Sequence, residues 1–414
     1  MATAVIDGIR LNNPELLNKL EGINGTLNAA VIIPEEDGVI SASDDRNVMV
    51  WLKRDSGQYW PSICHTMSAP VTALYFSSQD RKLFCGIETG LISEFELSED
   101  FNKITHKRDY AAHSGRVNGI IYSPNLNWLL SVSRDKYMQW HCCETGRRLG
   151  GYQANAWCIA LEYPSNNKLF DQDSKHIFVG DYGGSIAVLR VKDNNSSLVP
   201  VTTLQGHSGS IRCLAWDPDK QLLFSGSFDR TILVWDIGGR KGTVYQLHGH
   251  GDKIRALHYV REASKLISVA DDGFIVTWKM DVDRAETKEW LESDSCQRCD
   301  VPFFWNVKQM WSEKKIGFRQ HHCRKCGIAV CAKCSENTSV MPSLGFEFPV
   351  RVCNDCYETI TDADRQTLAT FFDTKCGISS MNYHHGKHLL VTCSNDRSIK
   401  IWNVELVMKD SLPQ

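Results

Sequence analysis

A short unit recurs along most of this chain and ends each time on a large apolar residue. In its clearest copy the turn residues Gly206-His207-Ser208-Gly209 precede alternating apolar stretches, and the unit closes at Ile232-Leu233-Val234-Trp235-Asp236. Units of this kind end at residues 51, 95, 140, 189, 235, 278 and 402. Five of the six steps measure 43 to 49 residues, a period typical of four-stranded propeller blades. The sequence therefore predicts a mainly β fold, a seven-bladed β-propeller interrupted before its last blade.

The residues at both ends of the units resemble the WD-repeat family. The resemblance is carried by Gly206-His207 with Trp235-Asp236, Gly249-His250 with Trp278-Lys279, and His113 with Trp140-His141. It implies propeller blades 1 to 6 within residues 15–280 and a last repeat at 372–405. It also implies closure by strands from both termini, with the stretch from Glu15 to Leu20 completing the seventh blade and removing an exposed sheet edge.

Histidines and aspartates recur within these units and could suggest catalysis. His113, His207 and His250 each open a unit, and an aspartate stands five or six residues before the closing tryptophan. Because they recur at one register, and because such residues form a hydrogen-bonded set in the WD-repeat family, we interpret them as structural. The chain carries no glycine-rich phosphate loop and no serine hydrolase order. We therefore expect a binding platform and no enzyme.

Composition indicates which ligands and which cellular compartment to expect for this chain. The 414 residues include 46 Lys+Arg and 49 Asp+Glu, and this net charge of −3 argues against nucleic-acid binding. The chain has no long apolar run, and its N-terminus lacks a basic stretch followed by an apolar one, which predicts a cytosolic or nuclear protein.

The cysteines of the chain are unevenly distributed. In a reducing compartment, paired cysteines indicate a metal site. Eight of the 16 cysteines fall between Cys296 and Cys356, all in C-x-x-C pairs.

These eight cysteines predict two structural zinc sites. A two-residue spacing lets both thiolates of a pair reach one tetrahedral Zn²⁺ at about 2.3 Å, and four thiolates leave no open position. The gaps between pairs hold 23, 4 and 18 residues, and the four-residue gap is too short for its flanking pairs to share an ion easily. The expected groups are Cys296, Cys299, Cys331 and Cys334 for one Zn²⁺ and Cys323, Cys326, Cys353 and Cys356 for the other.

The sequence around the second pair resembles the FYVE zinc-finger family. The run from Lys314 to Gly327 holds Arg319-Gln320-His321-His322-Cys323-Arg324 and no acidic residue, and Arg351-Val352-Cys353 follows later. The resemblance implies a finger at about 290–360 that binds phosphatidylinositol 3-phosphate on early endosomes. By position, the lipid headgroup would contact Arg319, His321, His322, Arg324 and Arg351. Ile316 and Phe318, flanked by Lys314 and Lys315, would enter the membrane.

Three departures from that family stand out. Gln320 replaces a basic residue, which removes one positive charge. The acid expected three residues after Trp290 comes one residue late, so Asp294 is only a further candidate for the headgroup. The long gap after Cys299 adds aromatic residues, among them Trp305 and Trp311. These either enlarge a membrane-facing surface or pack the finger against the propeller, and packing is the more ordinary role.

The two motifs together resemble the WD-repeat- and FYVE-domain-containing proteins. The resemblance implies an adaptor of the cytosol and the cytoplasmic face of early endosomes, whose finger reads the lipid and whose propeller binds protein clients such as signalling components. One alternative is a membrane-independent scaffold in which zinc only braces the last blade. A RING-like ubiquitin ligase is another, although that family normally has a histidine ligand. A homodimer would strengthen membrane binding by avidity, and the sequence leaves that state open.

Overall fold

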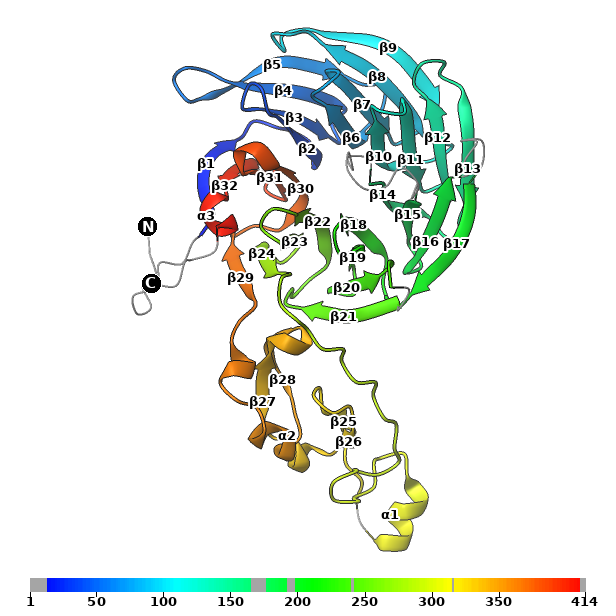
Figure 1. Ribbon diagram of the computed structural model, residues 1–414, viewed down its shortest axis with the longest axis vertical. Coiled ribbons are helices and arrows are strands. Elements are labelled where there is room, and N and C mark those ends of the chain that lie inside the picture. Colours follow the sequence, from blue (N-terminus) through cyan, green and yellow to red (C-terminus); the bar gives the residue numbers. More distant parts are fainter. Residues whose placement is uncertain (1–12, 165–175, 192–197, 240–241, 315, 410–414) are drawn as a thin grey trace.

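The strands of the chain form a ring of blades from which a small finger projects. The computed structural model describes residues 13–164, 176–191, 198–239, 242–314 and 316–409. Within them, seven sheets of four or more strands surround a central axis, and the first strand of each lies next to the axis (Figure 1). The expected mainly β, seven-bladed fold is confirmed.

The first four blades follow one another without interruption. From the inner to the outer strand they are β2 (Leu27–Ile33), β3 (Gly38–Ser43), β4 (Asn47–Lys53) and β5 (Tyr59–Thr66); β6 (Val71–Ser77), β7 (Lys82–Ile87), β8 (Leu91–Leu97) and β9 (Ile104–Ala111); β10 (Val117–Ser123), β11 (Trp128–Ser133), β12 (Tyr137–Cys142) and β13 (Arg148–Gln153); and β14 (Cys158–Glu162), β15 (His176–Asp181), β16 (Ser185–Val191) and β17 (Leu198–Gln205).

The last three blades complete the ring and carry the finger. They are β18 (Ile211–Asp217), β19 (Leu222–Ser227), β20 (Thr231–Asp236) and β21 (Gly242–His248); β22 (Ile254–Val260), β23 (Lys265–Ala270), β24 (Phe274–Lys279) and β29 (Ala369–Asp373); and β30 (Ile378–His384), β31 (Leu389–Ser394), β32 (Ile399–Asn403) and β1 (Glu15–Leu20). A short helix, α3 (Glu405–Met408), follows β32.

The unit ends seen in the sequence all lie in the third strand of a blade. Trp235 in β20 is buried, and its indole N–H donates to Ser225 Oγ at 2.8 Å. His207 Nε2 contacts the same hydroxyl at 2.8 Å, and its Nδ1 contacts Asp229 Oδ2 at 2.8 Å. Blade 6 repeats this set around His250. These residues therefore tie neighbouring strands together, which agrees with a structural role.

The ring closes through the seventh blade. Strand β1 pairs antiparallel with β32, with Glu15 opposite Asn403 and Leu20 opposite Ile399. The outer strand of this blade thus comes from the start of the described chain and its other three strands from the end. Such a pairing covers the edge that β32 would otherwise expose.

The finger interrupts the sixth blade. It precedes the last blade in the chain, and the strand pairing places it between the third strand, β24, and the outer strand, β29, which pair antiparallel. The range 15–280 thus supplies every strand of blade 6 except its outer one. The repeat period could not reveal this. The residues that end each unit lie in third strands, so the spacing does not show where the outer strand of a blade comes from in the chain.

The finger contains little regular structure. Its elements are α1 (Val307–Glu313), β25 (His321–His322), β26 (Ala329–Val330), β27 (Thr338–Met341), β28 (Phe346–Arg351) and α2 (Asn354–Glu358), with three short 3-10 turns. Strands β28 and β27 extend the sheet of blade 5 beyond β21, while α1 lies at the end farthest from the propeller (Figure 1). In the part of the chain that the structure describes, no helix is both long and apolar enough to cross a membrane.

Candidate zinc centre and basic cluster

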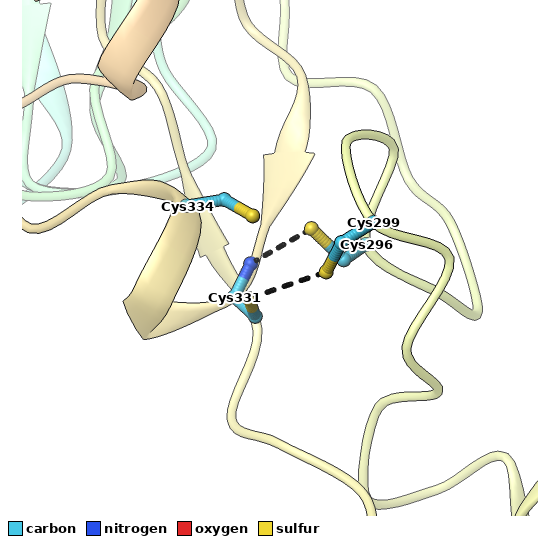
Figure 2. A group of neighbouring side chains, drawn as sticks. All are labelled: Cys296, Cys299, Cys331 and Cys334. Carbon is cyan, nitrogen blue, oxygen red and sulfur yellow. Dashed lines mark hydrogen bonds between the residues drawn. The ribbon is translucent and has the colours of Figure 1, made fainter.

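Eight cysteine thiols gather into two groups in the finger. One group contains Cys296, Cys299, Cys331 and Cys334, and the other contains Cys323, Cys326, Cys353 and Cys356. Within each group all four sulfurs lie within 4.8 Å of one another. Figure 2 shows the first group, in which a loop supplies one C-x-x-C pair and the segment after β26 supplies the other. The interleaved arrangement expected from the gap lengths is therefore present.

The spacing of the sulfurs fits zinc. A regular tetrahedron with Zn–S bonds of about 2.3 Å has S···S edges of about 3.8 Å. The sulfurs of Cys299 and Cys331 are 3.7 Å apart, and those of Cys326 and Cys353 are 3.9 Å apart. Four soft thiolate donors in a tetrahedron suit Zn²⁺. The finger thus carries two four-cysteine sites that fit two structural Zn²⁺ ions.

Backbone groups favour the thiolate form of one cysteine at the first site, Cys296. Burial alone would raise the pKa of the Cys296 thiol, but backbone N–H groups of Cys331, Arg298 and Cys299 point at its sulfur and leave its pKa below the ordinary value. The backbone nitrogen of Cys331 donates to that sulfur at 3.3 Å, and Figure 2 draws this contact as a dashed line. A thiolate is the form that binds a metal ion.

A glycine shapes the turn after the second pair. Gly327 has φ +79°, and its N–H donates to the carbonyl oxygen of Cys323 at 2.9 Å. A Cβ at this position would collide with the carbonyl oxygen of Glu289, and the carbonyl of Gly327 accepts from the Leu291 N–H at 3.0 Å. This turn therefore closes the second cysteine pair and also holds the segment that carries Trp290 beside it.

The basic residues expected to bind a headgroup converge on His321. We call Arg319, His321, His322, Arg324 and Arg351 the basic cluster. Burial lowers the pKa of His321, and the charges of Arg351, Arg319, Arg324 and His322 lower it further, which reports their proximity. The backbone N–H of Arg324 donates to the carbonyl of Arg351 at 3.1 Å, so β28 lies beside the turn that follows β25. Residues distant in sequence thus form one positive surface.

Trp290 organises one side of the basic cluster. Its ring stacks on His322 with the ring centres 4.8 Å apart and an interplanar angle of 11°. The Arg324 guanidinium lies 4.3 Å from the centre of the Trp290 ring. An indole holding an imidazole and a guanidinium restricts the movement of both. Sequence reasoning assigned no such role to Trp290, and its place before the first cysteine pair was the available signal.

An acidic residue, Glu292, lies beside His322. Its carboxylate lies 3.9 Å from His322 Nε2 and accepts from Gln320 Nε2 at 3.3 Å. The side chain of Asp294 instead accepts from the Trp305 indole at 3.0 Å. Of these two acids, the one suggested by the sequence is therefore engaged elsewhere, and Gln320 contributes a contact to Glu292 in place of a charge.

The other cationic side chains of this region differ in whether contacts within the finger hold them in place. Arg319 is exposed. The Arg351 guanidinium donates to the carbonyl of Ser335, so this side chain is held within the finger. Lys314 is exposed, while Lys315 lies outside the described residues.

The apolar residues near the cluster separate into buried and exposed members. Ile316 is 85% exposed and Trp311 is 86% exposed. Phe318 is half-buried, bridges to Phe303 through the backbone and lies under the Lys333 ammonium group, 5.6 Å from its ring centre. Phe318 thus belongs partly to the finger's own core, unlike Ile316.

Most of the aromatic residues added by the long gap are exposed. Phe304, Trp305 and Trp311 lie on or next to α1, at the end of the finger farthest from the propeller (Figure 1). The expectation that these aromatics pack the finger against the propeller is therefore wrong. Phe303, in contrast, is fully buried in the finger's core beside Cys296 and Cys323.

Comparisons with known proteins agree with this geometry. The FYVE zinc finger family matches residues 287–362, and the WD domain, G-beta repeat, matches 104–140, 198–236 and 365–403. WD repeat and FYVE domain-containing protein 1 of Mus musculus is 48% identical over 412 residues, 100% of this chain and 98% of the relative. The chain belongs to the family of WD repeat and FYVE domain-containing proteins.

Other WD repeat and FYVE domain-containing proteins also match over most of their length. Protein 2 of Homo sapiens is 50% identical over 95% of this chain and 96% of its own length. Protein 2 of Caenorhabditis elegans is 39% identical over 95% and 93%. A crystal structure of the WD40 β-propeller domain of Doa1 matches with a TM-score of 0.62 at 14% identity, covering 96% of this chain and 99% of that one. That last likeness concerns the fold alone.

Family membership accounts for both halves of the chain. The finger is a FYVE zinc finger with two four-cysteine groups, and the propeller is built from WD repeats. The third WD match, 365–403, begins just before β29 and ends with β32, so it includes the outer strand of blade 6 and three strands of blade 7. A phosphoinositide-binding type of adaptor or scaffold is the general function that this combination supports.

Proposed function

We propose that this protein is an adaptor that docks on early endosomes. Its finger binds phosphatidylinositol 3-phosphate at the cytoplasmic face of the membrane, and its propeller holds protein clients. The observation that carries this proposal is the geometry of the basic cluster, in which Trp290 stacks on His322 and under the Arg324 guanidinium, and the Arg324 N–H donates to the Arg351 carbonyl. A dianionic phosphate monoester complements such a surface, because guanidinium groups bind phosphate oxygens through paired hydrogen bonds.

The residues of the cluster have distinct roles in this proposal. The exposed Arg319 binds the 3-phosphate first, because among the described residues it makes no hydrogen bond or ion pair that would have to break. Arg324 and His322 contribute donors already oriented by stacking on Trp290. Arg351 adds charge from β28 while held by Ser335.

Glu292 supplies the acceptor that the inositol ring requires. Inositol hydroxyls donate hydrogen bonds, and the Glu292 carboxylate stands beside His322 with 78% of its side chain exposed. Asp294 is less suited to this role, because its carboxylate already accepts from Trp305. The acid therefore comes from two residues after Trp290.

The exposed apolar residues provide the membrane contact. Ile316 is three residues before Arg319, and the α1 region adds Phe304, Val307 and Trp311, all exposed. Lys308 and Lys314 are exposed in the same region. Apolar side chains beside cations match the boundary between acyl chains and anionic headgroups. We therefore assign the α1 region, together with Ile316, to the membrane-entering surface.

Zinc supplies folding energy to this site. The four sulfurs of each group would hold one Zn²⁺, and a segment with this small a core would depend on such ions for stability. The sixth-blade insertion ties both ends of the finger to the propeller. Lipid binding thus sets the orientation of the propeller at the membrane, where it presents clients.

Vesicle flotation tests the proposal. The full chain is mixed with vesicles that contain no phosphoinositide, phosphatidylinositol 3-phosphate, or one of its positional isomers. Selective flotation with the 3-phosphate lipid is expected, as is loss of that flotation in Arg319→Ala with both zinc ions retained. Arg147→Ala, which changes an exposed arginine of the propeller, serves as the matched control.

Two outcomes would overturn the proposal. Equal flotation with every vesicle type would mean that the finger binds membranes through negative charge alone and does not recognise the 3-phosphate. No flotation by a chain that contains two zinc ions would leave a membrane-independent scaffold whose zinc braces the sixth blade.

A further inference from the structure

A hollow of about 330 Å³ lies at one mouth of the propeller's central channel. Its walls come from the first residues of inner strands and from loops that join second to third strands. The finger leaves the propeller between a third and an outer strand. Because successive connections in an antiparallel sheet alternate between its two ends, the hollow opens on the face opposite the finger's connections.

Four arginines from three blades line this hollow. Arg116 and Arg134 belong to blade 3, Arg212 to blade 5 and Arg255 to blade 6. The described residues that line it include no aspartate or glutamate. The hollow is therefore strongly positive although the whole chain carries a net charge of −3.

Two of the four charges are balanced from outside the hollow. Arg116 Nη1 donates to Glu88 at 2.7 Å, and Arg255 donates to both carboxylate oxygens of Asp271 at 2.7 and 2.6 Å. These two arginines are thus paired and oriented.

In the part of the chain that the structure describes, no carboxylate forms an ion pair with Arg212 or Arg134. Among the residues that the structure describes, Arg212 has neither a hydrogen-bond acceptor nor an ion pair. Burial lowers the pKa of Arg212 to about 10, with Arg255, Arg116 and Arg134 contributing, so the side chain is still charged at neutral pH. An unpaired, partly buried cation beside three others is destabilising unless an anion accompanies it. Within the described residues, side chains thus neutralise two of the hollow's four positive charges and leave the other two unbalanced.

The rim of the hollow adds exposed aromatic surface. Trp157 is 41% exposed and Tyr182 is 54% exposed, and their rings lie 5.1 Å apart. The Arg134 guanidinium lies 5.5 Å from the Trp157 ring, and that of Arg255 lies 5.2 Å from Phe228. A free phosphate ion would use only the arginines. Exposed tryptophan and tyrosine beside them favour a ligand with apolar parts on either side of its anion, as in a peptide.

We propose that this hollow binds a phosphorylated serine, threonine or tyrosine side chain of a client protein. Arg212 and Arg134 bind the phosphate oxygens, while Trp157 and Tyr182 contact residues that flank the phosphorylated one. The inference rests on the client-binding half of the proposed function and is independent of the lipid-binding half. It makes client capture conditional on phosphorylation.

Fluorescence anisotropy with labelled peptide mixtures tests the inference on the full chain without membranes. One mixture carries a central phosphoserine, phosphothreonine or phosphotyrosine among randomised positions, and its counterpart lacks the phosphate. We expect binding that depends on the phosphate and weakens at least tenfold in Arg212→Gln. Arg134→Gln, at an exposed position, should weaken it as well and covers the case in which Arg212→Gln folds poorly. Arg212→Lys should restore only part, because lysine cannot bind phosphate bidentately.

Further arms separate the sources of phosphate and the two halves of the function. Inorganic phosphate and inositol hexakisphosphate are added as competitors, and Arg319→Ala should leave peptide binding unchanged. Equal binding of both peptide mixtures would overturn the inference while leaving the propeller as a client platform. Binding of inositol hexakisphosphate with no peptide binding would overturn it in favour of a soluble polyanion. Failed vesicle flotation with intact phosphopeptide binding would contradict only the lipid proposal.

Discussion

The backbone N–H of His248 donates to the carbonyl oxygen of Gly345 at 2.7 Å, and this bond joins the outer strand of blade 5 to the finger. The His248 ring also stacks on Phe346 with the centres 4.7 Å apart. Gly345 has φ +83°, and a Cβ there would collide with the carbonyl oxygen of Gln246. The finger is therefore attached to the propeller by a lateral contact as well as by its two chain connections.

Replacing Gly345 should loosen this attachment. In Gly345→Ala the new Cβ meets backbone that cannot move away, so β28 should separate from β21. We expect faster hydrogen exchange in β21 and β28 with both zinc ions retained. Gly57→Ala is the control, because Gly57 also has positive φ but no atom within 4 Å of the added Cβ. Unchanged exchange in Gly345→Ala would show that the lateral contact is dispensable.

Zinc removal should unfold the finger and spare most of the propeller. The cysteines form much of the finger's core, whereas the blades pack through apolar clusters of their own. After chelation, hydrogen exchange should rise throughout 290–360 and vesicle binding should disappear, while blades 1 to 4 stay protected. Cys323→Ser should reproduce the effect in part, and Cys64→Ser, at an exposed cysteine of β5, should not. Protection of the finger without metal would contradict a structural role for zinc.

Removing an exposed aromatic from α1 should weaken membrane binding without affecting headgroup recognition. Burying an indole in the bilayer interface contributes on the order of 1 to 2 kcal/mol, so Trp311→Ser should reduce vesicle affinity by roughly tenfold. Affinity for soluble inositol 1,3-bisphosphate, measured by calorimetry, should stay the same. Trp60→Ser removes an equally large exposed side chain from blade 1 and serves as the control. A parallel loss of both affinities would place Trp311 in the headgroup site instead.

Acid should weaken the propeller through the aspartates of its hydrogen-bonded sets. Burial alone would raise the pKa of Asp229, but His207 and Thr231 outweigh it and hold that pKa at about 2, below the usual value of 3.8 for this side chain. The ionised carboxylate therefore stabilises the fold above about pH 4, and this contribution is lost as the pH falls toward 2. Asp229→Asn should lower the free energy of unfolding by about 2 kcal/mol at pH 7 and by little at pH 2.

Urea unfolding followed at both pH values measures this difference. Asp252→Asn, which changes an exposed aspartate of the same face, provides the comparison. An equal loss in Asp229→Asn at pH 7 and pH 2 would mean that shape, and not charge, is what this position contributes.

The ring of blades could be predicted from the sequence because the tryptophans that end most of the units have the same packing role in each blade. Trp51, Trp140, Trp235, Trp278 and Trp402 are all buried in third strands, where a large side chain packs against both neighbouring strands. The cysteine groups were predictable for a similar reason, since chain length limits which pairs can meet around one ion. A sequence therefore predicts a structural feature when the same packing requirement recurs in every repeat, or when the feature depends on residues close together in the chain.

The details that the sequence did not reveal depend on tertiary contacts. Asp294 follows Trp290 at nearly the expected distance, yet the Trp305 indole binds it and leaves Glu292 beside His322. Phe318 and Ile316 are equally apolar, but Phe318 alone of the two bridges to Phe303. The arginines of the channel mouth come from separate blades with no shared register, so they become neighbours only when the ring closes.

The position of the finger within blade 6 also affects how the propeller assembles. The outer strand β29 can pair with β24 only after the chain has closed a loop that spans the whole finger. Loop-closure entropy grows with the length of flexible chain, and a metal-bound finger shortens that flexible length to its two short connections. By the usual scaling the saving is about 2 kcal/mol for a loop of roughly ninety residues. Zinc would thus favour completion of a β-sheet that contains none of its ligands, and the supply of metal would influence how fast the ring closes during synthesis.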